Sequence, residues 1–202
     1  MNGFPAIDGP AGLILAAGVS SRMPGRSKLR RRWARDTVLG AVLEAARRTG
    51  LDPVVVVGSP GTKKAVGATG AIVLEIASSG KGDSLATGLA ACPPGPVVVL
   101  LGDEPGIDVA AIRALCQASR ERGLDLARVA YRDRPGHPVW VGDRIRSLAV
   151  ELTGDESVWD RLRPRVADVG LVEVDMEAPI DVDSPAALRR ARDAAHGRDE
   201  RS

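Results

Sequence analysis

Short, wholly apolar runs alternate along the chain with longer segments whose apolar residues recur at helical spacing. Gly12 to Ala17 is one such run, and the run from Pro96 to Leu101 is the strongest. Continuous apolar runs of this length are typical of strands that are buried on both faces of a parallel sheet. Further strands are expected at residues 53–57, 71–74, 126–131, 137–141 and 171–174.

Polar N-cap residues predict where the intervening helices begin. Each precedes a segment with apolar residues at helical spacing: Asp36, Asp83, Asp108 and Ser184. A further helix is expected at residues 143–152. The alternation of strands and helices predicts an α/β fold with a mostly parallel central sheet.

Length and composition indicate how many domains the chain has and which kinds of partner it can bind. The chain has 202 residues and a formal net charge of +2, from 28 basic and 26 acidic residues. This length predicts a single domain over residues 1–196, followed by a frayed, charged tail at 197–202. Three Trp, one Tyr and one Phe are too few for the stacking platforms that bind single strands, so no nucleic-acid partner is expected.

Cysteine usage and the N-terminal sequence indicate the compartment. Cys92 and Cys116 are far apart and have neither zinc-site nor disulfide-framework spacing. Residues 1–10 lack a basic segment before an apolar stretch, and no run approaches the roughly 18 apolar residues of a membrane span. We therefore expect a cytoplasmic protein without a membrane partner.

A glycine-rich, basic loop follows the first predicted strand, where an open α/β sheet binds its ligands. It begins at Gly18 and carries Arg22, Arg26 and Lys28. Backbone N–H groups and fixed positive charge in such a loop suit a triphosphate. Neither a Walker A register nor G-x-G-x-x-G fits, which disfavours P-loop ATP hydrolysis and dinucleotide redox chemistry. A solvated basic loop is the alternative interpretation.

Two acidic segments fall where other predicted strands end. Asp103 follows the most apolar strand, and Asp181 and Asp183 project to the same side if their segment is extended. Mg²⁺ prefers one or two carboxylates together with phosphate oxygens and water. The sequence therefore predicts an Mg²⁺ site built from these carboxylates. A turn before a proline and an entry into the last helix are the alternative roles of these residues.

Taken in this order, the segments resemble the MobA-like NTP transferases, which are related to the molybdenum-cofactor guanylyl- and cytidylyltransferases. The resemblance extends from about Gly12 to Arg192 and rests on LILAAGVSSRM with the following Lys28, LLGDEP, PGHPVW, LTGD and DVDSP. The GHP triplet around His137, the GD pair ending at Asp155, and Ala17 favour the cytidylyltransferase-like branch that handles molybdopterin.

The resemblance implies a Rossmann-like three-layer α/β/α nucleotidyltransferase fold and an Mg²⁺-dependent enzyme. The implied reaction transfers CMP from CTP, favoured over GMP from GTP, to an anionic phosphorylated acceptor such as molybdopterin, and releases pyrophosphate. A molybdoenzyme or its maturation factor is an implied partner. A guanylyltransferase, a sugar- or alcohol-phosphate nucleotidyltransferase and a non-catalytic nucleotide-binding chaperone remain open.

Site roles also follow from the resemblance. Arg22, Lys28 and Asp103 are the implied catalytic residues, and Asp103 is the principal metal ligand, with Asp183 as the second ligand and Asp181 as the alternative. His137 and Asp155 are the implied acceptor-binding residues. The implied nucleotide-binding residues are Leu15, Ala16, Ala17, Gly18, Ser84, Leu85 and Gly88.

Two departures from the family pattern bear on the acceptor. Glu104 stands where relatives commonly carry Gln, which adds an acidic group beside the predicted metal site. A basic cluster at residues 30–35 could reach an anionic acceptor or dock a partner protein. Trp140 and Trp159 lie in or beside the motifs that would contact the acceptor.

Overall fold

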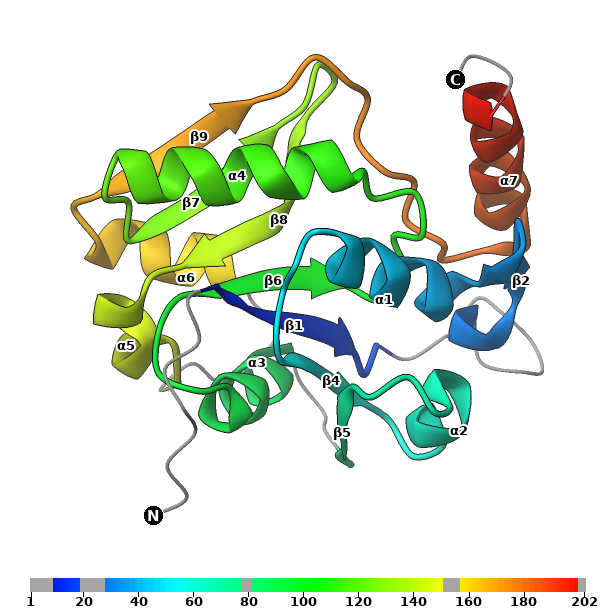
Figure 1. The fold of residues 1–202 in the computed structure, drawn as a ribbon, viewed down its shortest axis with the longest axis horizontal. Helices are drawn as coiled ribbons and strands as arrows, with labels where there is room; N and C mark the ends of the chain where they lie inside the picture. Colours follow the sequence, from blue (N-terminus) through cyan, green and yellow to red (C-terminus); the bar gives the residue numbers. More distant parts are fainter. Residues whose placement is uncertain (1–8, 19–27, 78–80, 151–156, 200–202) are drawn as a thin grey trace.

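A seven-stranded sheet forms the centre of the computed structural model (Figure 1), which describes residues 9–18, 28–77, 81–150 and 157–199. The strand order is β5-β4-β1-β6-β8-β7-β9. Strand β8 runs antiparallel to both of its neighbours, and the other neighbouring pairs are parallel. The strands are β1 (Ala11–Ala16), β4 (Val54–Gly58), β5 (Ile72–Glu75), β6 (Val97–Leu101), β7 (Leu126–Ala130), β8 (Pro135–Val141) and β9 (Val169–Glu173). The predicted mostly parallel α/β sheet is confirmed.

Helices cover both faces of this sheet. Helices α1 (Val38–Arg48) and α4 (Val109–Glu121) pack on one face, and α3 (Lys81–Ala91), α5 (Arg146–Val150) and α6 (Val158–Leu162) pack on the other. The remaining elements are α2 (Thr62–Val66), α7 (Pro185–Asp199), a short hairpin of β2 (Arg32–Trp33) and β3 (Asp36–Thr37), and the 3-10 turns η1 (Lys28–Arg30), η2 (Asp143–Ile145) and η3 (Arg163–Arg165). The arrangement is the three-layer α/β/α fold expected from the sequence.

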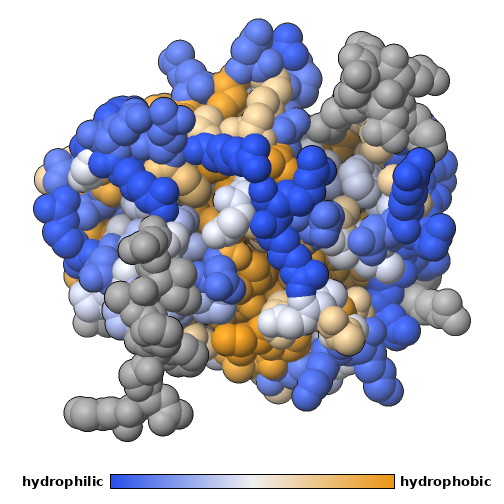
Figure 2. All heavy atoms as spheres, in the orientation of Figure 1, coloured by the Kyte–Doolittle hydropathy of each residue, from blue (hydrophilic) through white to orange (hydrophobic). Residues whose placement is uncertain are grey.

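The apolar runs are the central strands. Every residue of β4 is buried, and so are the first four residues of β6, because helices cover both faces of these strands. The view in Figure 2 shows hydrophilic residues predominantly around the rim of the molecule and hydrophobic residues mainly towards its middle. Within the part of the chain that the structure describes, no helix combines the length and the apolarity needed to cross a bilayer.

Two of the predicted helix caps are confirmed and two are wrong. Asp108 accepts a hydrogen bond from the backbone N–H of Ala110 (2.7 Å), and Ser184 accepts one from that of Ala187 (3.2 Å). Helix α1 begins one residue later than predicted and is capped by Thr37, whose Oγ1 accepts from the N–H of Gly40 (3.0 Å), whereas the side chain of the predicted cap, Asp36, accepts from the N–H of Thr37 (2.6 Å). Asp83 lies in the first turn of α3, which begins at Lys81.

Candidate active site

The carboxyl ends of β1 and β6 lie side by side at one edge of the sheet. The two strands pair in parallel, with Leu15 opposite Leu101, and the N–H of Gly102 donates to the carbonyl oxygen of Leu15 at 2.9 Å. A methyl group at position 102 would lie 3.1 Å from Cβ of Ala16 and 3.3 Å from that same carbonyl oxygen. Glycine therefore allows the two strand ends to approach closely, and this contact places Asp103 beside the loop that leaves β1.

Lys28 meets Asp103 at this edge. Turn η1 is anchored by Leu29, which is buried against α1, and the Nζ of Lys28 donates a hydrogen bond to Oδ2 of Asp103. The side chains of Lys28 and Asp103 are only 10% and 18% exposed. The structure therefore brings together two of the three residues predicted to be catalytic. The third, Arg22, lies outside the described residues.

Asp181 is the second carboxylate of this cluster. The N–H of the neighbouring Val182 donates to the carbonyl oxygen of Asp103 at 2.9 Å, which fixes the segment against the end of β6. The carboxyl group of Asp181 lies beside that of Asp103 and near the ammonium of Lys28. The pKa of Asp181 is raised to about 6, chiefly by burial and also by the negative charge of Asp103, while the ammonium of Lys28 opposes the shift.

Glu104 adds a buried carboxyl group behind the pair. It is 7% exposed, and its Oε2 has no hydrogen-bond partner among the described residues. Its pKa is raised to about 8, chiefly by burial and also by the charges of Asp103 and Asp181, while Arg134 opposes the shift. Near neutral pH the group is therefore largely protonated. The sequence showed the substitution of the usual glutamine but gave no sign of this burial.

The donor set fits a divalent cation that completes its shell with phosphate oxygens and water. No group of three or more His, Cys, Asp or Glu side chains suited to a metal occurs in the described part of the chain. Mg²⁺ takes only one or two carboxylates from a protein, so the neighbouring carboxylates of Asp103 and Asp181 are enough to hold it. A cation would also offset the repulsion between them. Asp181 and Val182 both contribute to the contacts between this segment and Asp103. The role of Asp183 as a ligand stays a prediction.

The predicted nucleotide-binding residues lie in two places. Ala16 is buried at the end of β1, Leu15 and Ala17 are half-buried, and Gly18 is exposed where the loop begins. On α3, Ser84, Leu85 and Gly88 are all buried. A methyl group at Gly88 would lie 2.3 Å from Cδ1 of Leu13, so this glycine allows α3 to pack closely on β1. The contacts of Gly88 are those of the core, and its part in nucleotide binding stays a prediction.

His137 lies on the wall of a cavity that opens beside the carboxylates. The cavity has a volume of about 280 Å³, and its wall includes His137, Glu104, Asp181, Arg128 and Trp159. The hydroxyl of Tyr131 donates to the carbonyl oxygen of His137 at 2.6 Å and fixes its backbone. We call this space the acceptor cavity. The other predicted acceptor residue, Asp155, lies outside the described residues.

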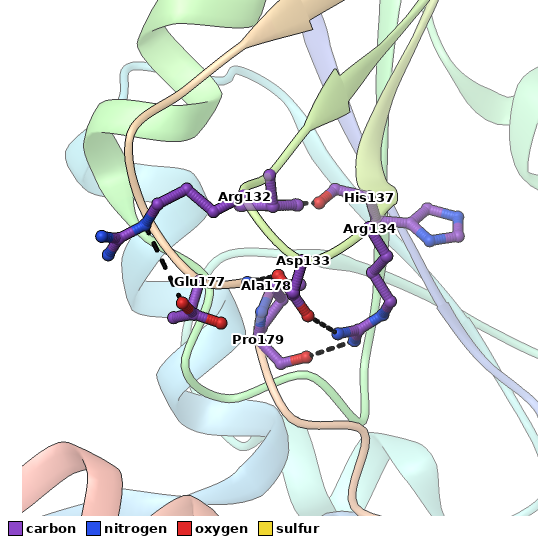
Figure 3. A network of polar contacts seen from close by, with 8 residues as sticks. Arg132, Asp133, Arg134, His137, Glu177, Ala178 and Pro179 are labelled. Atoms are coloured by element: carbon purple, nitrogen blue, oxygen red, sulfur yellow. Dashed lines mark hydrogen bonds and ion pairs between the residues drawn. The ribbon is translucent and has the colours of Figure 1, made fainter.

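A network of polar contacts holds the segment that leads to Asp181 (Figure 3). Asp133, in the turn between β7 and β8, accepts a hydrogen bond from the N–H of Ala178 at 2.8 Å and pairs with Arg134 at 2.8 Å. Arg134 in turn donates to the carbonyl oxygen of Pro179 at 2.8 Å. The hydrogen bond from Ala178 is the main reason that the pKa of Asp133 is lowered. The turn therefore sets the position of the chain just before Asp181.

The geometry agrees with a comparison against known families. A model of the MobA-like NTP transferase domain matches residues 12–169. The chain belongs to this family. The resemblance predicted from the sequence motifs is thereby confirmed, and this MobA-like protein is a nucleotidyltransferase with a Rossmann-like α/β fold.

Solved structures support the assignment over nearly the whole chain. The MobA-like protein is 30% identical to the Rv0371c homologue from Mycobacterium sp. strain JC1, with a TM-score of 0.82 over 93% of this chain and 96% of that one. Rv0371c from Mycobacterium tuberculosis H37Rv, solved in complex with manganese, is 27% identical, with a TM-score of 0.77 over 92% and 99% of the two chains. A comparison with curated proteins finds no match.

A more distant structure shares only the fold. The CMP:2-keto-3-deoxy-manno-octonic acid synthetase, solved in complex with CTP, is 18% identical, with a TM-score of 0.80 over 95% of this chain and 100% of that one. Its central architecture therefore matches that of the MobA-like protein.

Proposed function

We propose that this MobA-like protein transfers CMP from CTP to a phosphorylated, anionic acceptor of the molybdopterin kind, with Mg²⁺ as the cofactor. The observation that carries the proposal is the cluster of Lys28, Asp103 and Asp181 at the carboxyl ends of the central strands, in a chain that matches the MobA-like family. A phosphate oxygen of the acceptor attacks the α-phosphorus of CTP. The bond from that phosphorus to the bridging oxygen breaks, and pyrophosphate leaves with the bond's electron pair.

The residues of the site position the phosphates and offset their charge. Lys28 places a fixed positive charge next to Asp103 and is directed, in this proposal, at the α-phosphate. Asp103 and Asp181 would hold Mg²⁺, and Asp183 and Arg22 would complete the metal and triphosphate contacts. A bound Mg²⁺ neutralises charge that develops on the transferred phosphoryl group. Chemistry of this kind depends on positioning and on electrostatic stabilisation, which buried, preformed charges supply.

The choice of CTP and of the acceptor rests on motifs and on fold relatives. Ala17 and the GHP triplet around His137 favour the cytidylyl branch, and one fold relative was solved with CTP. His137 lines the acceptor cavity beside Asp181, which is where a phosphate must lie to attack. We further propose that the reaction takes place in the cytoplasm and that a molybdoenzyme or its maturation factor receives the product.

Pyrophosphate release with purified molybdopterin tests the proposal. Each of CTP, GTP, ATP and UTP is supplied with Mg²⁺, and we expect release with CTP and molybdopterin together but not with either alone. Preferential turnover of GTP would assign guanylyl transfer. Pyrophosphate release with a sugar phosphate, but not with molybdopterin, would assign a different class of acceptor.

A thermal-shift panel of the same nucleotides separates binding from turnover. A ligand at 100 times its dissociation constant stabilises the folded protein by about 2.7 kcal/mol. We expect the largest shift with CTP. Stabilisation by a nucleotide without pyrophosphate release for any acceptor would overturn the enzyme proposal in favour of a nucleotide-binding chaperone.

A further inference from the structure

A second cavity lies directly beyond the acceptor cavity, at the edge strand β9. Its volume is about 390 Å³, and we call it the β9 pocket. Its wall includes Arg128 of β7, Trp159 of α6, Arg163 of η3, and the apolar residues Val166 and Leu171. Leu171 is 48% exposed, since β9 ends the sheet and α6 and η3 leave its outer end uncovered.

The two cavities share a wall. Arg128 and Trp159 line both of them, and the guanidinium carbon of Arg128 lies 4.2 Å from the centroid of the Trp159 ring. This stacking holds Arg128 in place. A molecule in the acceptor cavity therefore meets Arg128 on the wall that the two cavities share.

Arg128 has unused hydrogen-bonding capacity. Its Nε is buried and has no hydrogen-bond partner among the described residues. A charged donor that is removed from water without a partner carries a desolvation cost, which an anionic acceptor atom would offset. The side chain is thus a half-buried cation that the protein itself satisfies only in part.

Arg163 adds a second positive charge at the same place. Burial lowers the pKa of Arg128, the charge of Asp160 opposes this shift, and the charge of Arg163 lowers the pKa further. The two guanidinium groups therefore repel each other. The Oδ2 of Asp160 already accepts a hydrogen bond from Ser157 at 2.7 Å. Among the described residues that line the pocket, two are cationic and none is acidic.

We propose that the β9 pocket binds a second oxyanion of the acceptor, with Arg128 and Arg163 as its binding residues and the Trp159 ring as the apolar wall beside them. This inference rests on the proposed function, because it takes the molecule in the acceptor cavity to be the one whose phosphate attacks CTP. The acceptor is then elongated and carries anionic groups at both ends, one beside Asp181 and one between the arginines. Either a phosphate or a carboxylate would supply the negative charge that pairs with Arg128 and Arg163.

Direct binding of inorganic phosphate tests the pocket without turnover. Phosphate is titrated into the metal-free protein while tryptophan fluorescence is recorded, with chloride at equal ionic strength as the control. We expect a saturable change that disappears in Trp159→Phe. The change should weaken by about tenfold or more in Arg128→Gln and by about threefold in the more exposed Arg163→Gln.

Arg165→Gln is the matched control. Arg165 lies in the same 3-10 turn as Arg163 and is exposed, but it does not line the pocket. Phosphate binding should be unchanged in this variant. A loss equal to that of Arg163→Gln would overturn the proposal, and so would unaltered phosphate binding in Arg128→Gln and Arg163→Gln. If Arg128→Gln does not fold, Arg163→Gln still decides.

A kinetic arm separates this inference from the proposed function. With CTP and molybdenum-loaded molybdopterin, whose oxo-molybdenum group supplies a second anionic end, Arg163→Gln should raise the KM for the acceptor about threefold and leave kcat and the KM for CTP unchanged. Phosphate binding of the expected pattern without turnover would sink the proposed function and leave the oxyanion site standing. Turnover that is insensitive to Arg163→Gln, together with no phosphate binding, would sink the oxyanion site alone. A carboxylate probe, acetate, tests whether the site prefers phosphate.

Discussion

Lys28 donates a hydrogen bond from its Nζ to Oδ2 of Asp103, a residue 75 positions further along the chain. The pair joins the loop that follows β1 to the end of β6, so the cation proposed to act on the triphosphate and the carboxylate proposed to bind the metal lie in contact. Both side chains are largely shielded from water, and the ammonium of Lys28 also acts on the carboxyl group of Asp181. The consequences of breaking this pair can therefore be predicted separately for catalysis and for folding.

Asp103→Ala should lower metal-dependent pyrophosphate release on the order of 10²-fold or more, because the principal metal ligand is lost. The fold should persist, since Asp103 lies at a strand end and not in the core. The measurement is the rate of pyrophosphate release together with the far-ultraviolet circular dichroism spectrum. Asp175→Ala is the control, because the Asp175 side chain is 93% exposed and should tolerate the change. Turnover near that of the wild type in Asp103→Ala would sink the assignment.

Glu104 should make stability fall as pH rises. Its folded pKa is about 8, against an ordinary value of 4.5, so between these values the unfolded chain loses the proton while the folded protein retains it. The unfolded state then binds fewer protons, and the free energy of unfolding decreases with pH through this window. Glu104→Gln removes this dependence. We expect the variant to gain about 3 kcal/mol relative to the wild type between pH 5 and pH 8.

Urea unfolding at pH 5 and pH 8 in the presence of EDTA measures this difference. Asp181 also has a raised pKa, and its contribution has the same sign in both proteins, so the difference between wild type and variant reports Glu104 together with its coupling to Asp181. Stability curves that stay parallel across the window would contradict the prediction.

Sequence patterns predicted those features of the molecule that are determined by residues close together in the chain. The apolar run of β6 followed by Asp103 predicted a carboxylate at the edge of the sheet. A polar residue directly after a buried strand lies at the strand's carboxyl end, where open α/β sheets bind ligands. Helix α6 was missed, since five residues are too few to show a period. The stacking of Arg128 on Trp159 and the burial of Glu104 arise from residues brought together by the fold, and no local pattern carries them.

Asp133→Ala should impair catalysis more than it impairs folding. The side chain holds the N–H of Ala178, 45 residues away, and through Arg134 the carbonyl oxygen of Pro179, so its loss frees the segment before Asp181. As Asp133 touches no reacting group, we expect a higher metal concentration for half-maximal activity, with a nearly unchanged melting temperature. Metal titrations of pyrophosphate release measure this, and Asp133→Asn, which keeps one acceptor oxygen, should recover part of the affinity. A fall in kcat at saturating metal without any shift in the titration would contradict a positioning role.

The two candidate second ligands can be told apart by metal dependence. EDTA should abolish pyrophosphate release, and either Mg²⁺ or Mn²⁺ should restore it, since both are accepted by carboxylate and phosphate oxygens. The carboxyl group of Asp181 lies beside that of Asp103, and the backbone N–H of Asp183 donates to the carbonyl oxygen of Asp181 at 3.2 Å. We expect Asp181→Asn to raise the half-maximal metal concentration about tenfold or more, because a ligand charge is lost and a hydrogen-bonding amide remains. Asp183→Asn is the matched variant two residues away, and a larger shift there would reverse the order and make Asp183 the second ligand, as the sequence motif implied.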